Sequence, residues 1–255
     1  MVNYNPKTYW TDVANRIEQR GKDNIIAGDD EPYYRYKRKK FLQLLDRVET
    51  KSKSILEIGH GPGGNLDHLS KKHSAEKLTG VDISETMHRL AKSKLSDKVR
   101  LELIDGSSLP FSNSEFDIVF SATVLQHNTN ETTLVNLIKE MCRVSSNNVI
   151  LFEKIENPIK GTDLCMGRPV EYYNKIISAQ GFHLESVDYL DINISYYVSG
   201  AIRKGLNSSK REEGQPLNAI SIFLQNITIP ITKQLDKVFP AKRNVAKLIF
   251  KRIKS

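Results

Sequence analysis

The sequence predicts an α/β fold: a Rossmann-like, doubly wound, seven-stranded and mainly parallel sheet, with N-terminal helices and a helical insertion before the last strand. Two observations carry this prediction. Short apolar runs alternate with helical segments through the middle of the chain, and such alternation needs crossover connections that make neighbouring strands parallel. The length of 255 residues, with 39% hydrophobic and 27% charged side chains, suits one globular domain with appendages.

Two helices are expected before the first strand. Apolar side chains recur at three- and four-residue spacing over residues 7–19 and 33–48, and Pro32 ends the loop expected between them at residues 21–32. From residue 54 the pattern changes to short apolar runs, each followed by a helical stretch or a turn. These runs predict strands at residues 54–59, 77–83, 99–105, 116–122 and 147–155, with helices at 65–72, 85–95, 131–143 and 170–179.

The last part of the chain adds two strands and an insertion. Residues 183–194 and 244–253 have the pattern of strands, residues 194–206 look helical, and residues 205–216 are rich in turn formers. The expected division is a helical cap over residues 1–50, an α/β core over 51–195, the insertion over 196–241 and the last strand within 242–255. Inside the insertion one apolar helix stripe is formed by Leu217, Ile220, Leu224, Ile227 and Ile231.

The basic character of the chain lies at its C-terminal end. Residues 201–255 hold 12 Lys and Arg against 3 Asp and Glu, whereas residues 1–200 hold 26 against 27. The basicity is therefore a property of the tail, and no nucleic-acid partner is expected. The charged tail and its apolar stripe have two interpretations. The stripe packs over the substrate pocket or a twin subunit, in a monomer or a homodimer, or it docks peripherally on an anionic membrane.

Cysteine usage and hydropathy predict the compartment. Cys142 and Cys165 are too few for a disulfide framework and lack the spacing of metal ligands, so a reducing compartment and no metal are expected. Charged residues interrupt the N-terminal segment, where a signal peptide needs an apolar run of ~7–15 residues. The longest uncharged stretch, residues 216–232, falls short of the ~20 apolar residues of a membrane span. We expect a cytoplasmic protein, with peripheral contact to the inner face of the membrane as the alternative.

The sharpest motif is a glycine-rich loop. The first strand contains Glu57 and runs into Gly59, Gly61, Gly63 and Gly64 before a helix. Such glycines permit a tight turn and a close approach of backbone to ligand, and the helix that follows offers free N–H groups. The first, second and fourth of these glycines match the dinucleotide pattern G-x-G-x-x-G. A carboxylate at the end of the second strand, Asp82, lies at about the ~20-residue distance of a ribose-binding acid.

Three acids, Glu57, Asp82 and Asp105, stand in order on or after successive strands, and Ser-Ala-Thr-Val ends the fourth. This succession resembles the class I S-adenosylmethionine-dependent methyltransferases over about residues 54–155, in particular their small-molecule, methyltransferase type 11-like branch. The resemblance implies S-adenosylmethionine as the cofactor and S-adenosylhomocysteine as its product. It implies that the methionine part contacts Glu57, Gly59, Gly61 and Gly63, the ribose Asp82, the adenine Ile83, Asp105 and Gly106, and the sulfonium region Ser121 or Ala122.

Physical chemistry agrees with these roles, because a carboxylate accepts hydrogen bonds from ribose hydroxyls or an exocyclic amine, and charge assistance makes each about twice as strong as a neutral bond. A second interpretation is that Asp82 and Asp105 are turn formers and helix caps at strand ends, sites that Asp favours in general. His60 departs from the small or acidic residue expected inside the loop, and it is expected to pack over the cofactor.

A hydroxyl acceptor needs a base. His127, just past the fourth strand, is the first candidate, and Glu153, near the end of the fifth strand, is the second. A histidine at a strand-to-helix junction also serves as a capping residue. An amine acceptor needs only desolvation.

Substrate contacts are expected from two segments outside the glycine loop. In related enzymes the helices before the first strand close over cofactor and substrate, which implies contacts from Tyr33, Tyr34 or Arg35. Arg168 and Tyr172 lead into the last core helix, where related enzymes present substrate contacts. The alternatives are a solvated cationic helix face for the first group and helix-start geometry for the second.

The expected function is methyl transfer from S-adenosylmethionine to an oxygen or nitrogen of a small-molecule, sugar or lipid-linked acceptor. Three alternatives remain. An NAD(P)-dependent oxidoreductase shares the glycine loop, but no Tyr-x-x-x-Lys pair follows that loop. A nucleic-acid methyltransferase fits the charge, but an Asn-Pro-Pro-Tyr type motif is absent after the fourth strand. A non-catalytic binding protein would have no need of the three acids.

Overall fold

The computed structural model describes residues 4–20 and 31–253, and the chain divides into two compact units. The core unit comprises Met1–Thr11, Glu49–Asp188 and Arg243–Ser255. The helical unit comprises Asp12–Val48 and Tyr189–Lys242. The N-terminal helices and the insertion, which the sequence treats as separate parts, thus belong largely to one unit.

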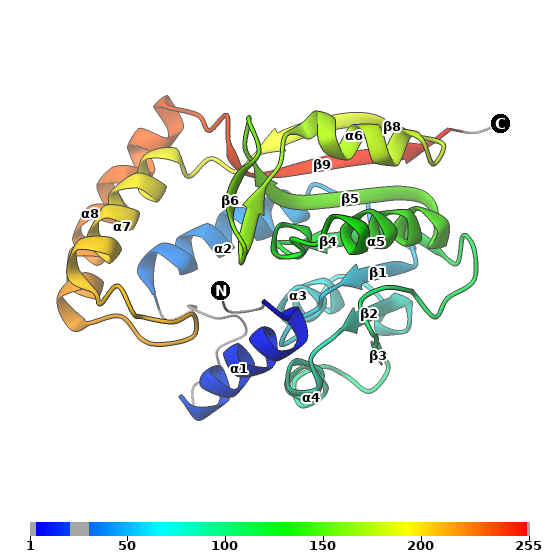
Figure 1. Cartoon of the computed structure of the whole chain (residues 1–255), viewed down its shortest axis with the longest axis horizontal. Coiled ribbons are helices and arrows are strands. Elements are labelled where there is room, and N and C mark those ends of the chain that lie inside the picture. The colour runs from blue at the N-terminus through cyan, green and yellow to red at the C-terminus, as the bar shows by residue number, and fades with distance from the viewer. Residues whose placement is uncertain (1–3, 21–30, 254–255) are drawn as a thin grey trace. The chain divides into compact units, whose positions relative to one another are not determined.

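The core unit is built on a seven-stranded sheet of order β3-β2-β1-β4-β5-β9-β8 (Figure 1). The first five strands in this order pair in parallel, and β9 runs antiparallel to β5. The prediction of a mainly parallel, seven-stranded sheet is confirmed. The strands are β1 (Ile55–Ile58), β2 (Leu78–Asp82), β3 (Arg100–Leu103), β4 (Phe116–Ala122), β5 (Ser145–Ile155), β8 (Phe182–Tyr189) and β9 (Asn244–Arg252).

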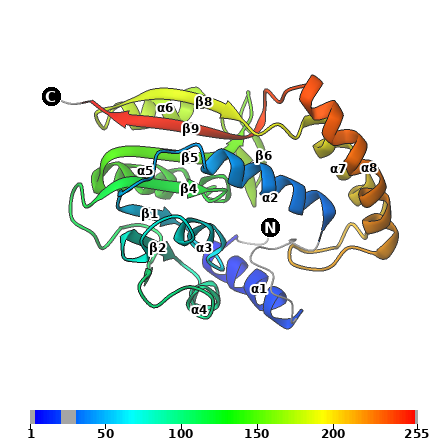
Figure 2. The same ribbon diagram turned by 180° about the vertical axis from the view of Figure 1, so that it is seen from behind.

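Helices cover both faces of this sheet. Figure 1 shows α5 and α6 in front of it, and Figure 2, seen from behind, shows α3 on the opposite face. Covered on both sides, β1 and β2 bury every side chain, as expected of parallel strands inside a doubly wound fold. The helices and helical turns are α3 (Gly64–Ser70), η1 (Ala75–Lys77), α4 (Glu85–Lys92), η2 (Leu125–His127), α5 (Glu131–Val144) and α6 (Val170–Ser178).

Two details differ from the sequence prediction. A short hairpin of β6 (Lys160–Thr162) and β7 (Cys165–Gly167) was not expected, because three-residue strands are too short to show a period. The expected strand over residues 183–194 ends at Tyr189, and Asn193 begins α7 instead. This helix starts early because the backbone N–H groups of Ile194 and Ser195 donate to Asp236 Oδ1, at 2.7 and 3.1 Å.

The helical unit contains α2 (Pro32–Leu45), α7 (Asn193–Leu206) and α8 (Ala219–Val238), and α7 and α8 pack against each other and against α2. Helix α1 (Pro6–Gln19) begins in the core unit and belongs to the helical unit from Asp12 on. The loop expected over residues 21–32 lies, up to residue 30, outside the described residues. None of the described helices combines the length and apolar character that a membrane crossing requires.

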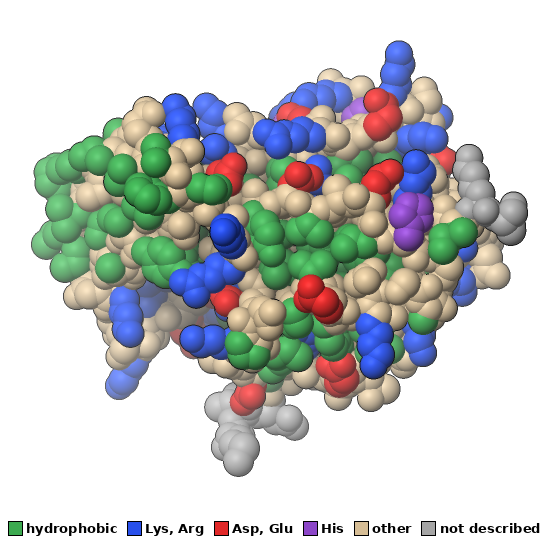
Figure 3. Space-filling view, turned by 90° about the horizontal axis from the view of Figure 1, so that it is seen from above, with side chains coloured by type: hydrophobic (Ala, Val, Ile, Leu, Met, Phe, Trp, Pro, Cys, Tyr) green, Lys and Arg blue, Asp and Glu red, His purple; other side chains and the backbone are tan. Residues whose placement is uncertain are grey.

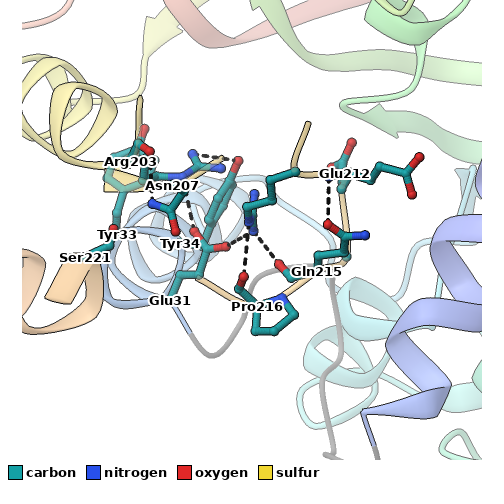
Figure 4. Close-up of polar contacts among 12 residues, drawn as sticks. Glu31, Tyr33, Tyr34, Arg203, Asn207, Glu212, Gln215, Pro216 and Ser221 are labelled. Carbon is teal, nitrogen blue, oxygen red and sulfur yellow. Dashed lines mark hydrogen bonds and ion pairs between the residues drawn. The ribbon is translucent and has the colours of Figure 1, made fainter. Parts of the chain in front are cut away.

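Buried polar groups hold the helical unit together. Asp236 accepts hydrogen bonds from two backbone N–H groups of α7, from the Ser195 hydroxyl and from the Tyr36 hydroxyl. Glu31 is ion-paired with Arg203 and Arg211, at 3.3 and 2.7 Å (Figure 4). Burial raises the pKa of Glu31, and the two guanidinium groups oppose this shift. Both carboxylates are therefore tied to partners far away in the sequence.

Most of the apolar stripe of the insertion is exposed among the residues that the structure describes. Ile220 and Ile231 are each 62% exposed and Ile227 is 51% exposed, while only Leu217 of the predicted set is buried. The packing of this stripe over the substrate pocket, over a twin subunit or on a membrane stays a prediction.

Replacement of Asp236 by Ala leaves two backbone N–H groups and two hydroxyls without their charged acceptor. We expect a loss of about 3 kcal/mol in the free energy of unfolding, measured by urea denaturation. Asp191→Ala, at an exposed acid of the same unit, is the control and should change stability by less than about 0.5 kcal/mol. Equal losses in the two variants contradict the role of Asp236.

Candidate active site

The candidate site lies at the carboxyl ends of the parallel strands. The strand order reverses at β1, which pairs with β2 on one side and β4 on the other, and such a switch point is where open α/β sheets bind ligands. The glycine loop follows β1 directly. The predicted cofactor residues Asp82 and Ala122, the last residues of β2 and β4, lie at the same edge of the sheet.

The glycine loop folds back on β2. The N–H groups of Gly59 and His60 both donate to the carbonyl of Val81, at 2.8 and 3.1 Å. A Cβ atom added at Gly59 would lie 2.5 Å from Val124 Cγ2, so the loop is closed against the segment after β4 at this point. At Gly61, where φ is +53°, an added Cβ would meet no atom within 4 Å. The loop is thus tight at one glycine and open at another, as a backbone that approaches a ligand needs to be.

Asp82 joins the loop to β2. Its Oδ2 accepts from the Gly61 N–H and its Oδ1 from the Ser84 N–H, both at 2.9 Å. The turn-forming interpretation is therefore confirmed. It does not compete with ribose binding, because each carboxylate oxygen keeps a second lone pair. Glu57 is buried, and its Oε1 accepts from Asn65 Nδ2 at 2.7 Å, which fastens β1 to α3.

His60 is buried and packs against β2. Its Nδ1 donates to the carbonyl of Gly61 at 2.6 Å, and a Cβ added at Gly80 would lie 3.0 Å from the His60 Cβ. Burial lowers the pKa of His60, against the opposing effect of the Asp82 carboxylate. His60 therefore serves as a neutral packing residue of the loop.

The predicted adenine contacts follow β2 and β3. Asp105 is exposed, and its Oδ1 accepts from the N–H and hydroxyl of Ser107 and from the N–H of Ser108. These hydrogen bonds lower the pKa of Asp105, and the bond from the Ser107 N–H has the largest effect. Asp105 thus forms a turn, and its contact with adenine stays a prediction. A Cβ added at Gly106 would lie 3.2 Å from Ile83 Cγ2, so these two predicted residues are neighbours.

Glu153 does not have the environment of a base. Its side chain is fully buried, and its Oε1 accepts from the Ser121 hydroxyl and from the N–H groups of Val124 and Leu125, at 2.9 to 3.1 Å. The N–H of Gln126 donates to Oε2 at 3.1 Å. Burial raises the pKa of Glu153, and these hydrogen bonds oppose the shift. Glu153 is a positioning residue for η2. The Ser121 hydroxyl is turned to it, which leaves Ala122 at the end of β4 as the expected contact near the sulfonium.

His127 stands at the end of a directed chain of hydrogen bonds. The Lys154 N–H donates to Gln126 Oε1 at 3.1 Å, so the Gln126 amide group faces His127 Nε2, also at 3.1 Å. His127 Nε2 must then accept, and Nδ1 must carry the proton that it donates to the carbonyl of Leu164 at 2.8 Å. This order fixes the neutral tautomer whose Nε2 has the basic lone pair.

Sequence reasoning missed Trp10, whose ring centroid lies 4.9 Å from that of His127 at an interplanar angle of 85°. One residue on, the hydroxyls of Thr11 and Ser84 are 3.2 Å apart. Because Ser84 follows β2 and His127 follows β4, this segment of α1 reaches the ends of both strands that flank β1. The one available signal was that Trp10 is the single tryptophan of the chain.

The predicted substrate contact Arg168 is committed to structural hydrogen bonds, whereas a substrate role for Tyr172, which is half-buried, stays a prediction. Arg168 is buried, and its guanidinium donates to the carbonyls of Leu125 and Asn128 at 3.3 and 3.1 Å. The Tyr172 hydroxyl donates to Glu131. A buried guanidinium needs such acceptors, so Arg168 is committed to η2 and the residues around it.

The predicted contacts Tyr33, Tyr34 and Arg35 lie in the helical unit. Tyr33 is buried and its N–H donates to Gln225 Oε1 at 3.2 Å. The Tyr34 hydroxyl accepts from Arg203 at 3.2 Å, as Figure 4 shows, and Arg35 is exposed. These contacts explain Tyr33 and Tyr34 as packing residues of the helical unit, and a substrate role for the three stays a prediction.

Residues 55–148 match the family model described as "Methyltransferase domain". This segment belongs to that family. A probable tocopherol O-methyltransferase of Oryza sativa subsp. japonica is 30% identical over 110 residues, which are 42% of this chain and 30% of the relative. Ajmaline N-methyltransferase of Rauvolfia serpentina is 28% identical over 111 residues, 42% of this chain and 37% of the relative. The chain thus spans about a third of the length of these two curated relatives.

The fold of the methyltransferase domain extends to nearly the whole chain. Magnesium protoporphyrin IX methyltransferase from Synechocystis PCC 6803, solved with bound S-adenosylhomocysteine, superposes with a TM-score of 0.59 over 97% of this chain and 98% of that chain, at 14% identity. At this identity the likeness concerns the fold. The match to a methyltransferase domain confirms the cofactor predicted from the sequence, S-adenosylmethionine, at the level of the family.

Glu153→Gln places an amide NH₂ group where the carboxylate accepts backbone N–H groups. We expect a loss of about 2–4 kcal/mol in the free energy of unfolding, by urea denaturation. Glu171→Gln, an exposed acid on α6, is the matched control and should cost less than about 0.5 kcal/mol. A Glu153→Gln protein as stable as the control would rule out the positioning role.

Gly61→Ala fills the open side of the loop. Gly181 is a matched control, because it also has a positive φ and open space around an added Cβ but lies outside the glycine loop. Both variants should lose about 1–2 kcal/mol of stability from left-handed strain. Only Gly61→Ala should weaken S-adenosylhomocysteine binding, by at least tenfold in calorimetric titration. Equal affinities of the two variants would place the cofactor elsewhere.

Proposed function

We propose that this protein transfers a methyl group from S-adenosylmethionine to an oxygen or nitrogen atom of a small-molecule, sugar or lipid-linked acceptor, and releases S-adenosylhomocysteine. The observation that carries the proposal is a glycine loop that is open at Gly61 and tied to Asp82, inside a segment that matches the methyltransferase domain. The names of the relatives support both acceptor atoms, one being an O-methyltransferase and one an N-methyltransferase.

The residues around the glycine loop suit the cofactor. Asp82 offers free lone pairs to ribose hydroxyls, and the neighbouring Ile83 and Gly106 offer an apolar surface for a flat base. The open side of Gly61 gives room for close backbone contact. When bound, S-adenosylmethionine supplies an activated methyl group on its sulfonium, so the protein has to orient the acceptor and exclude water.

The acceptor side is formed by residues after β4. Ala122 is the last residue of β4, His127 is the last residue of η2, and the Trp10 ring packs against the imidazole. For a hydroxyl acceptor, His127 Nε2 exchanges its hydrogen bond from Gln126 for one from the acceptor and takes the proton as the methyl group transfers. Because Nδ1 already donates to the Leu164 carbonyl, that carbonyl stabilises the imidazolium that forms. For an amine acceptor the same pocket supplies orientation and desolvation alone.

The experiment that tests the function is incubation of the protein with labelled S-adenosylmethionine and fractionated extracts of its source cell. We expect label in a small-molecule, sugar or lipid fraction. Label confined to the nucleic-acid fraction, or tight binding of NAD in place of S-adenosylhomocysteine, contradicts the proposal.

With an acceptor identified, His127→Ala should lower turnover by ~10²–10⁴-fold if the acceptor is a hydroxyl, with little change in cofactor affinity. His183→Ala, at an exposed histidine on β8, is the control and should leave turnover unchanged. A loss of less than tenfold for His127→Ala with a hydroxyl acceptor removes the histidine from the mechanism.

A further inference from the structure

Helix α8 turns its apolar side chains outward. Phe223 and Val238 are 62% and 68% exposed, and Leu235 is exposed as well, so the solvent-facing stripe continues past the residues that the sequence indicates. At 3.6 residues per turn these positions fall on one side of the helix through about five turns. We call this side the apolar face; it consists of Ile220, Phe223, Ile227, Ile231, Leu235 and Val238. Figure 3 shows hydrophobic side chains gathered at the left, where α7 and α8 lie in Figure 1.

The opposite, buried face of the same helix is mostly polar. Gln225 accepts from the Tyr33 N–H, and the hydroxyls of Ser195 and Thr232 are hydrogen-bonded at 2.8 Å. Asp236 accepts from α7 and α2 as described above. A surface helix ordinarily buries its apolar side, and here that order is reversed. Rotating α8 to bury its apolar face would break these bonds and expose their partners, so the polar network fixes the outward orientation.

The charges next to the apolar face are positive. From residue 193 to residue 242 the chain holds seven Lys and Arg against three acids. Two of the bases, Arg203 and Arg211, are paired with Glu31, while Asp236 is buried and Glu212 is paired with Arg16 at 3.0 Å. On α8 itself, which is described throughout, the other charged side chains are Lys233 and Lys237. By the helical repeat Lys237 lies on one flank of the apolar face, whereas the Lys233 ammonium lies over the Tyr36 ring of α2, 4.9 Å from its centroid.

We propose that the apolar face of α8 docks on an anionic phospholipid membrane, with its apolar side chains in the boundary between headgroups and acyl chains and with Lys237 and Lys242 near lipid phosphates. A second copy of the chain would bring two basic flanks together, whereas anionic headgroups complement them. A helix of 20 residues is about 30 Å long and lies in the plane of the surface. The inference goes beyond methyl transfer and does not depend on it.

The test is sedimentation of the full chain with vesicles, without cofactor or acceptor, so that its outcome is separate from that of the methyl-transfer experiment. One set contains phosphatidylcholine alone and the other phosphatidylcholine with phosphatidylglycerol. We expect binding to the anionic vesicles at ~0.1 M salt and at least tenfold weaker binding at ~1 M, because the screening length falls from ~10 Å to ~3 Å. Neutral vesicles should bind at least tenfold more weakly than anionic ones.

Matched variants locate the surface. Ile231→Glu should weaken binding to anionic vesicles by at least tenfold, whereas Ile253→Glu, at a similarly exposed apolar residue after β9 (57%), should leave it unchanged. Lys237→Glu changes an exposed charge without touching the apolar face, and it should also weaken binding by at least tenfold even if Ile231→Glu fails to fold.

Three results would overturn the proposal. The first is no sedimentation with anionic vesicles at ~0.1 M salt, where the screening length is ~10 Å. The second is equal binding to neutral and anionic vesicles. The third is a dimer, seen by light scattering, that Ile231→Glu dissociates while vesicle binding stays the same, since a second copy would then occupy the apolar face.

Discussion

The candidate site depends on how the residues between Thr123 and Asn128 are held. Glu153 accepts three consecutive backbone N–H groups of this segment, and Arg168 donates to two of its carbonyls. Thr123 has a positive φ of 58°, a strained conformation for a β-branched residue, and such strain persists only where the surroundings determine the backbone. Here the buried Glu153 carboxylate and the buried Arg168 guanidinium hold the backbone in this conformation.

The contacts of Glu153 and Arg168 with residues 123–128 shape both the cofactor loop and the acceptor side. They set Val124 against Gly59, so the first glycine of the loop is closed by a side chain from the segment after β4. They also set Gln126 and His127 in the hydrogen-bond chain that leaves the imidazole neutral with its basic Nε2 toward the amide. The two residues best explained as positioning groups, Glu153 and Arg168, thus act on the proposed chemistry without touching it.

The helical unit is governed by a different constraint, the satisfaction of buried polar groups. Asp236 is held by partners on α7 and α2, and Glu31 by Arg203 on α7 and by Arg211 in the loop that follows. The bonds between helices are lost if the helices rotate. Apolar surface on α8 is therefore left outside as a consequence of polar packing within the unit. A lipid-linked acceptor would share the membrane with a protein docked by this face, which connects the proposed surface to one class of the proposed acceptors.

The sequence by itself determined the seven strands of the main sheet, the helices around it, the glycine loop and the turn at Asp82, because each depends on spacing within one segment or between neighbouring strands. It did not show the short β6–β7 hairpin or the early end of β8. It did show the apolar stripe of α8. Only the tertiary structure decided that this stripe faces outward, since the deciding bonds join Asp236 to Tyr36 and Ser195. It likewise decided that Glu153 and Arg168 are positioning residues, because their partners lie roughly 25 to 45 residues earlier in the chain. A residue type and its place after a strand are local properties, whereas the direction in which a buried charge finds its partners is set by packing.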